Sequence, residues 1–409
     1  MSTLAWFAVG SLAVWVWLLL GQGFFWRTDQ RLPATDRGPG SAPWREGTTA
    51  TAEPGPWPRV AVLVPARDEA AVLPLSLPSL LAQDYPGPAE VVLVDDGSSD
   101  GTGRLAEELS GRHGGLPLTV ARPGEPEPGW TGKLWALRHA MAVARTREPG
   151  PEYLLLTDAD IAHEPDSLRL LVSAAVTHDL DLVSQMARLR VESGWERLVV
   201  PAFVYFFAQL YPFRWINRAR PRATAAAGGC VLLRTETAVA AGVPASIRRA
   251  VIDDVSLARA VRRSGGRLWL GLADHVDSVR PYPGLGELWR MVSRSAYAQL
   301  RHNPLLLAGT VAGLALIYLL PPAALVAGAA TGDATAAWAG GAAWALMAGT
   351  YVPMLRYYHQ RPWTAVLLPF TALLYLLMTV DSAVQHYRGR GAAWKGRTYS
   401  ADHVAQPGE

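Results

Sequence analysis

Long apolar stretches at both ends of the chain constrain its fold most strongly. Residues 4–25 contain no charged side chain, and a helix of this length can cross a bilayer core of about 30 Å. Three more apolar stretches lie near the other end, at about residues 305–330, 334–355 and 363–380. We therefore expect a multi-pass membrane protein whose apolar segments flank a large, more polar region.

The composition agrees with this expectation and excludes several other classes of protein. Charged residues make up 18% of the chain, below the roughly 25% of an average soluble domain. The single cysteine, Cys230, excludes an intramolecular disulfide and a zinc site built from cysteines. The net charge of +3 is too small to indicate a nucleic-acid partner, so we expect none.

The first apolar stretch is more typical of a retained anchor than of a cleaved signal peptide. No basic residue precedes it, no small-residue cleavage site follows it, and aromatic residues crowd its second half. Four arginines follow between residues 27 and 45, which places the next region in the cytoplasm, at the cell (inner) membrane. Four full crossings would leave the basic tail outside, so either the segment with Pro321 and Pro322 does not cross fully or the tail breaks the positive-inside rule.

The region between the apolar segments alternates strand and helix patterns. Strands are expected at 60–64, 90–94, near 118 and at 153–157, and helices up to 83, around 105 and at 133–145. Their short connections favour an α/β domain with a parallel sheet covered on both faces. The expected domains are an N-terminal membrane anchor (1–26), a Pro- and Gly-rich linker (27–58), the α/β domain (59–303), C-terminal transmembrane segments (304–385) and a basic tail (386–409).

Acidic residues follow three of the expected strands, at the edge of a parallel sheet where ligands bind. Carboxylates gathered at one edge repel one another, so a divalent cation or the hydroxyl groups of a sugar nucleotide would account for them. For Asp95 and Asp96 the alternative is an Asp-Gly turn, with Ser98 or Ser99 capping the next helix. The acids are Asp68 and Glu69 after the first strand, Asp95, Asp96 and Asp100 after the second, and Asp158 and Asp160 after the fourth.

A D-x-D sequence is a weak signal by itself, and the chain contains two. Asp158-Ala-Asp160 directly follows an apolar run, which favours contact of Asp160 with a metal or a diphosphate over a solvated loop. Asp179-Leu-Asp181 instead precedes its apolar run, which indicates a turn that leads into a strand.

Lysine is rare in this chain, since only Lys133 and Lys395 stand among 38 basic residues. Lys133 lies at the start of an expected helix, where a diphosphate would be held, and the alternative is a surface lysine. Asp253 and Asp254 open another helical pattern. Helix capping explains one of these two acids, so the second needs a functional explanation.

Six motifs occur in the order and spacing of the family 2 glycosyltransferases, which this sequence resembles over residues 59–300. They are PARDEA, VDDGSSDGT, the GK lysine, LLLTDAD, GGCVLLR and IDDVSLARAV. The resemblance implies the GT-A fold, the Rossmann-like fold of nucleotide-diphospho-sugar transferases. The stretches FFWRTDQRL and RPYPGLGELWRMVSRSAYAQLRHNPLLL also resemble the hopene-associated glycosyltransferases.

This resemblance implies a metal-dependent, inverting transfer of sugar from a nucleotide-sugar, specifically a UDP-sugar. Asp254 would be the general base, although Asp253-Asp254 replaces the usual Glu-Asp and leaves open which acid acts. Asp160 would hold Mg²⁺ or Mn²⁺, with Asp158 near the ribose or the donor sugar. The nucleotide-sugar site would comprise Pro65, Arg67, Asp68, Glu69, Asp95, Asp96, Lys133 and Asp158, and the acceptor site Gly228, Gly229 and Arg294.

Apolar segments on both sides of the motifs favour a lipid acceptor, which the resemblance narrows to a hopanoid or other polyprenoid. Residues 198–213 are apolar and aromatic, which indicates either a segment lying on an anionic membrane or a buried helix. The Q-x-x-R-W motif of processive synthases is broken around Arg294, which favours transfer of a single sugar. The alternatives are a polyprenyl-phosphate acceptor and a catalytically inactive GT-A scaffold in a membrane complex.

Overall fold

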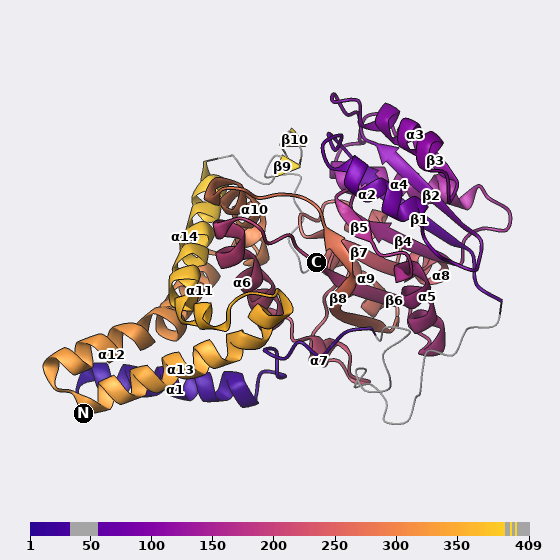
Figure 1. Ribbon diagram of the computed structural model, residues 1–409. Helices are drawn as coiled ribbons and strands as arrows, with labels where there is room; N and C mark the ends of the chain where they lie inside the picture. The colour runs from indigo at the N-terminus through magenta and orange to yellow at the C-terminus, as the bar shows by residue number, and fades with distance from the viewer. Residues whose placement is uncertain (33–55, 389–392, 395–396, 399–409) are drawn as a thin grey trace. The chain divides into compact units, whose positions relative to one another are not determined.

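The computed structural model describes residues 1–32, 56–388, 393–394 and 397–398 (Figure 1). Most of the expected linker and of the basic tail therefore lies outside the described residues. Within the described part, the chain forms two compact units. Unit 1 draws on Met1–Thr28, Val191–Trp215 and Tyr282–Gly391, and unit 2 on Asp29–Arg190, Ile216–Pro281 and Ala392–Glu409.

Unit 2 is built on a mixed sheet of eight described strands. They are β1 (Val60–Ala66), β2 (Ala89–Asp95), β3 (Leu118–Ala121), β4 (Tyr153–Thr157), β5 (Ile161–His163), β6 (Leu182–Arg188), β7 (Cys230–Arg234) and β8 (Leu268–Ser278). Their order across the sheet is β3-β2-β1-β4-β7-β6-β8-β5. A separate pair, β9 (Ala393–Trp394) and β10 (Arg397–Thr398), is antiparallel.

The expected parallel sheet is present only in part. β3, β2, β1 and β4 pair in parallel, as the alternation of strands and helices predicts. β7, however, pairs antiparallel with both β4 and β6, and β5 pairs antiparallel with β8. These four parallel strands include β1, β2 and β4, which the first three acidic motifs follow.

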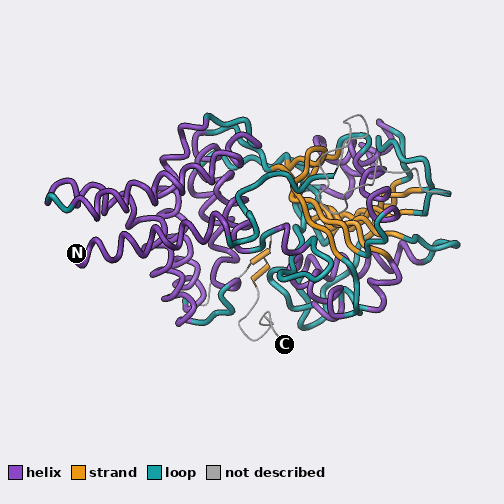
Figure 2. The backbone as a smooth tube through the Cα atoms, turned by 90° about the horizontal axis from the view of Figure 1, so that it is seen from below, coloured by secondary structure: helices purple, strands orange, loops and turns teal. Residues whose placement is uncertain are grey.

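Helices cover both faces of this sheet, as the sequence predicts (Figure 2). Val62 and Val64 of β1 belong to one core, whereas Ala61 and Leu63 belong to the other, because successive side chains of a strand point to opposite faces. The first core contains residues of α2 (Leu73–Leu81), α3 (Thr102–His113) and α5 (Ser167–Thr177). The second contains residues of α4 (Gly132–Arg145), α8 (Thr235–Ala240), the 3-10 turn Ala245–Ile247 and α9 (Asp253–Arg263).

Unit 1 is helical in its described residues. Three of its segments are long and apolar enough to cross a membrane, namely Thr3–Leu20, Pro304–Thr331 and Pro362–Tyr387. Its elements are α1 (Thr3–Leu20), α6 (Gly194–Leu210), α10 (Leu285–Gln299), α11 (Pro304–Leu314), a π-turn (Ala315–Leu319), α12 (Leu320–Thr331), α13 (Ala334–Tyr357), a 3-10 turn (Pro362–Leu367) and α14 (Leu368–Tyr387), and α7 (Phe213–Ile216) leads into unit 2.

The expected apolar stretch at 334–355 forms α13, a helix of 24 residues that is not among the three segments apolar enough to cross. It is rich in Ala and Gly and packs closely on α12, as small residues allow for helices in lipid. A Cβ on Gly340 would lie 2.6 Å from the carbonyl oxygen of Pro321, and one on Gly328 would lie 2.5 Å from the nitrogen of Ala337. Glycine therefore permits the close approach of these two helices (Figure 1).

The segment with Pro321 and Pro322 is a helix interrupted by a π-turn. Because proline has no N–H, the carbonyl of Ile317 loses its donor within the helix. Trp15 Nε1 donates to that carbonyl at 2.8 Å, and Ser11 Oγ donates to the adjacent carbonyl of Leu316 at 2.8 Å. α1 therefore satisfies the backbone groups that the two prolines leave open, as a span in lipid requires.

For residues 198–213, the structure supports the buried-helix alternative. α6 begins with a capping box formed by Ser193 and Glu196. Tyr205 Oη lies 2.8 Å from Thr350 Oγ1 of α13, and Tyr375 Oη of α14 donates to the carbonyl of Val199 at 3.0 Å. These bonds hold α6 inside unit 1.

Candidate active site

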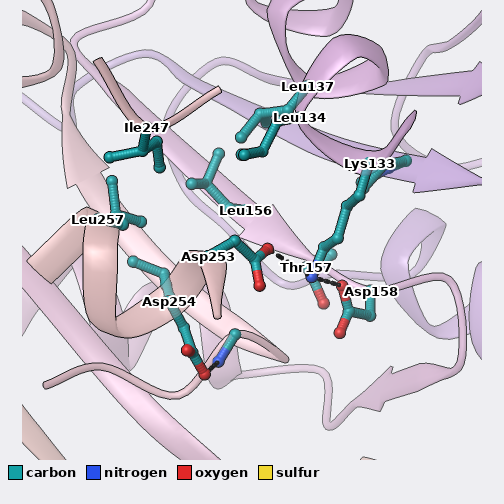
Figure 3. Close-up of a pocket in the computed structure, with 13 residues that line it drawn as sticks. Lys133, Leu134, Leu137, Leu156, Thr157, Asp158, Ile247, Asp253, Asp254 and Leu257 are labelled. Carbon is teal, nitrogen blue, oxygen red and sulfur yellow. Dashed lines mark hydrogen bonds and ion pairs between the residues drawn. The ribbon is translucent and has the colours of Figure 1, made fainter. Parts of the chain in front are cut away.

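In unit 2 the structure brings Lys133, Asp158, Asp253 and Asp254 together beyond the carboxyl end of β4 (Figure 3). Lys133 is the second residue of α4, Asp158 directly follows β4, and the two other acids open α9. The four residues line a cavity of about 30 Å³, which is room for about two water molecules. Its floor is apolar and consists of Leu134, Leu137, Leu156, Val231, Ile247 and Leu257.

The side chain of Lys133 joins two of these acids. Its Nζ lies 2.8 Å from Asp158 Oδ1 and 3.0 Å from Asp253 Oδ2. Burial alone would lower the pKa of Lys133, but the two carboxylates outweigh it and hold the pKa above its ordinary value. With a side chain only 24% exposed and two carboxylate partners, Lys133 is not the surface lysine of the alternative interpretation.

Asp254 differs from its neighbours because backbone N–H groups hold it. The N–H of Gly228 donates to its Oδ2 at 3.1 Å, and the N–H of Val255 donates to its Oδ1 at 2.7 Å. Burial first, and then the carboxylate of Asp253, raise the pKa of Asp254 to about 7, while these two N–H groups and Lys133 act in the opposite direction. A carboxylate that titrates near neutral pH is suited to general base catalysis.

The turn Gly228–Gly229 forms the wall beside Asp254. A Cβ on Gly228 would lie 3.5 Å from Asp254 Cβ and 3.6 Å from Lys133 Nζ, so this backbone borders the cavity directly. Cys230 follows the turn as the first residue of β7, and burial raises the pKa of its thiol to about 12. A buried thiol of this kind is inert, and Cys230 serves packing.

Helix capping does not explain the pair Asp253 and Asp254. α9 begins at Asp253 with Ile252 at its N-cap, and the N-cap makes no side-chain hydrogen bond. The expected cap after β2 is also absent, because α3 has Gly101 rather than Ser98 or Ser99 at its N-cap. The expected turn after β2 is present, however, because the N–H of Ser98 donates to Asp95 Oδ1 at 2.9 Å.

The loops after β1 and β2 place most of the remaining expected nucleotide-sugar residues side by side. Arg67 donates to the carbonyl of Asp96, and its Nη1 lies 3.6 Å from Asp96 Oδ2. Asp68 has a left-handed backbone with φ of 50°, and its Oδ1 accepts the N–H of Ser99 at 2.8 Å. Pro65, near the end of β1, lines the cavity with Lys133.

Asp160 lies in a second cluster that sequence reasoning did not find. Arg280, just after β8, donates through Nε to Asp160 Oδ2 and through Nη2 to Glu69 Oε2, both at 2.5 Å. The chain contains 36 arginines, so the presence of an arginine at position 280 does not by itself indicate a site residue. Its position two residues after the strand Leu268–Ser278 is the feature that would have indicated it. Arg294, expected in the acceptor site, lies on α10 in unit 1.

Comparisons with known proteins identify the family and the fold of this chain. The family described as "Glycosyltransferase like family 2" matches residues 58–298, more than half of the chain. The mannosyltransferase PcManGT from Pyrobaculum calidifontis, solved in complex with GDP-Man and Mn²⁺, superposes with a TM-score of 0.57 at 21% sequence identity. That match covers 93% of this chain and 99% of the other, and it bears on the fold alone.

Two curated relatives match parts of the chain. One is the undecaprenyl-phosphate 4-deoxy-4-formamido-L-arabinose transferase of Pseudomonas aeruginosa, 27% identical over 44% of this chain and 48% of that protein. The other is the beta-monoglucosyldiacylglycerol synthase of Synechocystis sp., 32% identical over 41% of this chain and 33% of that protein. The chain thus spans half or less of the length of these relatives. Since residues 58–298 include the whole eight-stranded sheet and the site in unit 2, the chain belongs to the family 2 glycosyltransferases, and unit 2 has the GT-A fold.

Proposed function

We propose that this protein is a membrane-bound, inverting glycosyltransferase that moves one sugar from a UDP-sugar to a lipid acceptor. The observation that carries the proposal is Asp254, whose pKa of about 7 suits a base, beside a lysine that joins Asp158 to Asp253. Family membership supplies the reaction class. The geometry supports roles for the individual residues.

In this proposal Asp254 takes the proton of the acceptor hydroxyl. The hydroxyl oxygen bonds to the anomeric carbon of the donor sugar as the bond from that carbon to the diphosphate breaks. A single displacement inverts that carbon, and Asp254 later releases the proton to solvent. The carboxylate of Asp253 is already engaged by Lys133 at 3.0 Å, which supports Asp254 as the catalytic residue.

The donor side would be formed by the loops after β1, β2 and β4. We assign Asp96, with the backbone from Pro65 to Asp68, to the uridine, and Asp158 to the ribose or donor sugar. Lys133 would face the diphosphate from the N-terminus of α4, where the helix dipole also favours negative charge.

Asp160 and its neighbour Glu69 would hold the divalent cation. No group of three or more His, Cys, Asp or Glu side chains is placed to hold a metal among the residues that the structure describes. A site of one or two carboxylates fits Mg²⁺ or Mn²⁺, because these ions complete their coordination with substrate phosphates and water. When bound, the cation would neutralise charge on the departing diphosphate.

A lipid acceptor is supported by the apolar helices that precede and follow the catalytic region in the sequence. They also support a multi-pass protein, and the arginines that follow the first apolar stretch support a cytoplasmic catalytic unit at the cell (inner) membrane. The two relatives carry lipids in their names, undecaprenyl phosphate in one and a glucosyldiacylglycerol in the other. The resemblance to the hopene-associated group favours a hopanoid or other polyprenoid, and the Pseudomonas relative favours polyprenyl phosphate as the second candidate.

Titration calorimetry of the detergent-solubilised full chain tests the donor site. We expect UDP to bind more tightly with Mn²⁺ in the native chain, and Asp160→Asn to lose this dependence. Asp179→Asn, in the other D-x-D turn, is the matched control and should behave as the native chain. Binding of neither UDP nor GDP would overturn the proposal in favour of a scaffold.

Transfer from labelled UDP-sugars then identifies the acceptor. Hydroxylated hopanoids, undecaprenyl phosphate and diacylglycerol are offered in separate reactions, and the products are separated by thin-layer chromatography. A labelled hopanoid supports the first candidate, and a labelled undecaprenyl phosphate supports the second.

A further inference from the structure

The function proposed above gives Arg280 no role, yet its guanidinium lies against the two carboxylates that would hold the divalent cation. Its guanidinium donates to Asp160 Oδ2 and Glu69 Oε2 at 2.5 Å each. The side chains of Arg280, Asp160 and Glu69 are 26%, 15% and 10% exposed, so solvent screens their charges only partly. A guanidinium keeps its positive charge in proteins, so Arg280 supplies one cationic group to these two carboxylates.

Hydrogen bonds that do not involve Arg280 hold the main chain at both acidic residues. The N–H of Val279 donates to the carbonyl of Asp160 at 2.9 Å, and the N–H of Glu69 donates to Thr102 Oγ1 at 2.8 Å. If the guanidinium turns away, the backbone still keeps the two acidic residues at the same place in the fold. Two adjacent negative charges repel one another, so another cation has to replace the guanidinium.

We propose that Arg280 is the resident counter-ion of the metal site and exchanges with the divalent cation. It holds Asp160 and Glu69 together until a nucleoside diphosphate binds. The diphosphate then accepts hydrogen bonds from the guanidinium, whose planar fork matches phosphate oxygens, and the carboxylates become available to the cation. This inference rests on the proposed function, because it requires a diphosphate donor and a divalent cation at the same site.

The exchange makes metal binding and nucleotide binding depend on each other. Without nucleotide, a divalent cation has to displace a fixed positive charge from its own ligands. With nucleotide, the guanidinium has a new partner and the cation gains phosphate oxygens. By linkage, the nucleotide strengthens metal binding by the factor by which the metal strengthens nucleotide binding.

Mn²⁺ binding to the full chain tests this exchange without measuring activity. Free Mn²⁺ is measured by electron paramagnetic resonance, without nucleotide and with saturating UDP, for the native chain and for Arg280→Gln. We expect the variant to bind Mn²⁺ about tenfold more tightly without nucleotide, since it lacks the competing charged contacts. We also expect UDP to strengthen Mn²⁺ binding by a smaller factor in the variant than in the native chain.

Arg234→Gln is the matched control, because Arg234 also lies between two carboxylates. Its Nη2 is 3.1 Å from Asp179 Oδ1, and its Nε is 3.5 Å from Asp181 Oδ1. Arg234 pairs in register with Tyr153 at the start of β4, at the end of that strand away from the active site. This variant should leave Mn²⁺ affinity unchanged both with and without UDP.

Unchanged or weaker Mn²⁺ binding by a folded Arg280→Gln would overturn the inference. If native UDP binding still depends on Mn²⁺, the proposed function stands in that case. A native chain that binds neither UDP nor Mn²⁺ would overturn both. Should Arg280→Gln fail to fold, Arg280→Lys takes its place, because it keeps the charge without the fork. It should show a smaller gain in Mn²⁺ affinity, and no gain would overturn the inference.

Discussion

Two D-x-D turns in unit 2 have the same spacing but different partners. Asp158-Ala-Asp160 lies at the carboxyl end of β4, and Asp179-Leu-Asp181 lies just before the start of β6. In the first turn, cationic side chains from distant segments hold the carboxylates: Lys133 holds one and Arg280 the other.

The second turn is held in part by groups that cannot move. The N–H of Arg267 donates to Asp181 Oδ2 at 2.8 Å, and the hydroxyl of Thr237 donates to Asp181 Oδ1 at 2.6 Å. Asp179 has a left-handed backbone with φ of 49°, and it pairs with Arg234 at 3.1 Å. The sequence-based prediction of a turn that leads into a strand is therefore confirmed for this motif.

This comparison shows that the groups bonded to the carboxylates, rather than the D-x-D motif itself, distinguish a ligand-binding turn from a structural turn. A backbone N–H is fixed by the fold, and its bond to Asp181 stabilises the start of β6. Lysine and arginine side chains can turn away on flexible stems and accept a ligand in place of the carboxylate. The first turn is thus open to exchange at both carboxylates, whereas in the second turn backbone and hydroxyl donors commit Asp181 to the fold.

The largest effect at the carboxyl edge is expected from Asp254→Asn. An amide cannot take the proton of the acceptor, so sugar transfer should fall by about 10²- to 10⁴-fold. The amide oxygen can still accept one of the two backbone N–H groups that hold Asp254, so at the cost of the other bond the fold and the affinity for UDP should be retained. Initial rates of transfer test the loss of catalysis, and calorimetry with UDP tests the retained affinity. Full sugar transfer by Asp254→Asn, together with loss of transfer by Asp253→Asn, would assign the general base to Asp253 instead.

The pH profile is expected to give the next largest effect, with no change of sequence. Because burial and Asp253 raise the pKa of Asp254 to about 7, the base is protonated below this pH and ionised above it. kcat/KM should therefore rise with pH through about 7, and at pH 5 it should be about 100-fold below its plateau. Asp253→Asn removes a charge that raises this pKa, so its profile should shift to lower pH. A flat native profile between pH 5 and 8 would contradict the assignment.

Lys133→Arg tests whether the bridge between two acids needs a point charge. A planar guanidinium cannot reproduce the contacts of one ammonium group at 2.8 Å and 3.0 Å. Loss of one charged hydrogen bond of about 1.5 kcal/mol corresponds to a roughly tenfold fall in kcat/KM for the UDP-sugar. Steady-state kinetics at varied concentrations of the UDP-sugar measure this fall in kcat/KM. Native kinetics in the variant would mean that the rarity of lysine in this chain has no functional cause here.

The parallel part of the fold was predictable because its signals are local. Apolar runs that end in acids gave β1, β2 and β4, and the start of α4 fell within one residue of its expected position. The rule that ligands bind at the carboxyl ends of strands then indicated where Lys133 and Asp158 would meet.

Other features depend on contacts between distant segments, and the sequence carries no local sign of them. The antiparallel direction of β7 follows from how the chain returns to the sheet, which its apolar run does not encode. Arg280 acts only because β8 ends near Asp160, and Trp15 supports Ile317 across more than 300 residues of chain. Pairings of this kind appear only once the chain is folded.

The smallest effect on function is expected at the amino edge, from Asp181→Asn. Its carboxylate accepts a backbone N–H and a hydroxyl, so the change should cost about 1–3 kcal/mol of stability, which thermal denaturation in detergent measures. Asp179→Asn should cost less than about 1 kcal/mol, because the side chain of Asp179 is 76% exposed. Both variants should bind UDP and Mn²⁺ as the native chain does. Weaker Mn²⁺-dependent UDP binding in a folded Asp181→Asn, as expected for Asp160→Asn, would show that the two turns do not differ in kind.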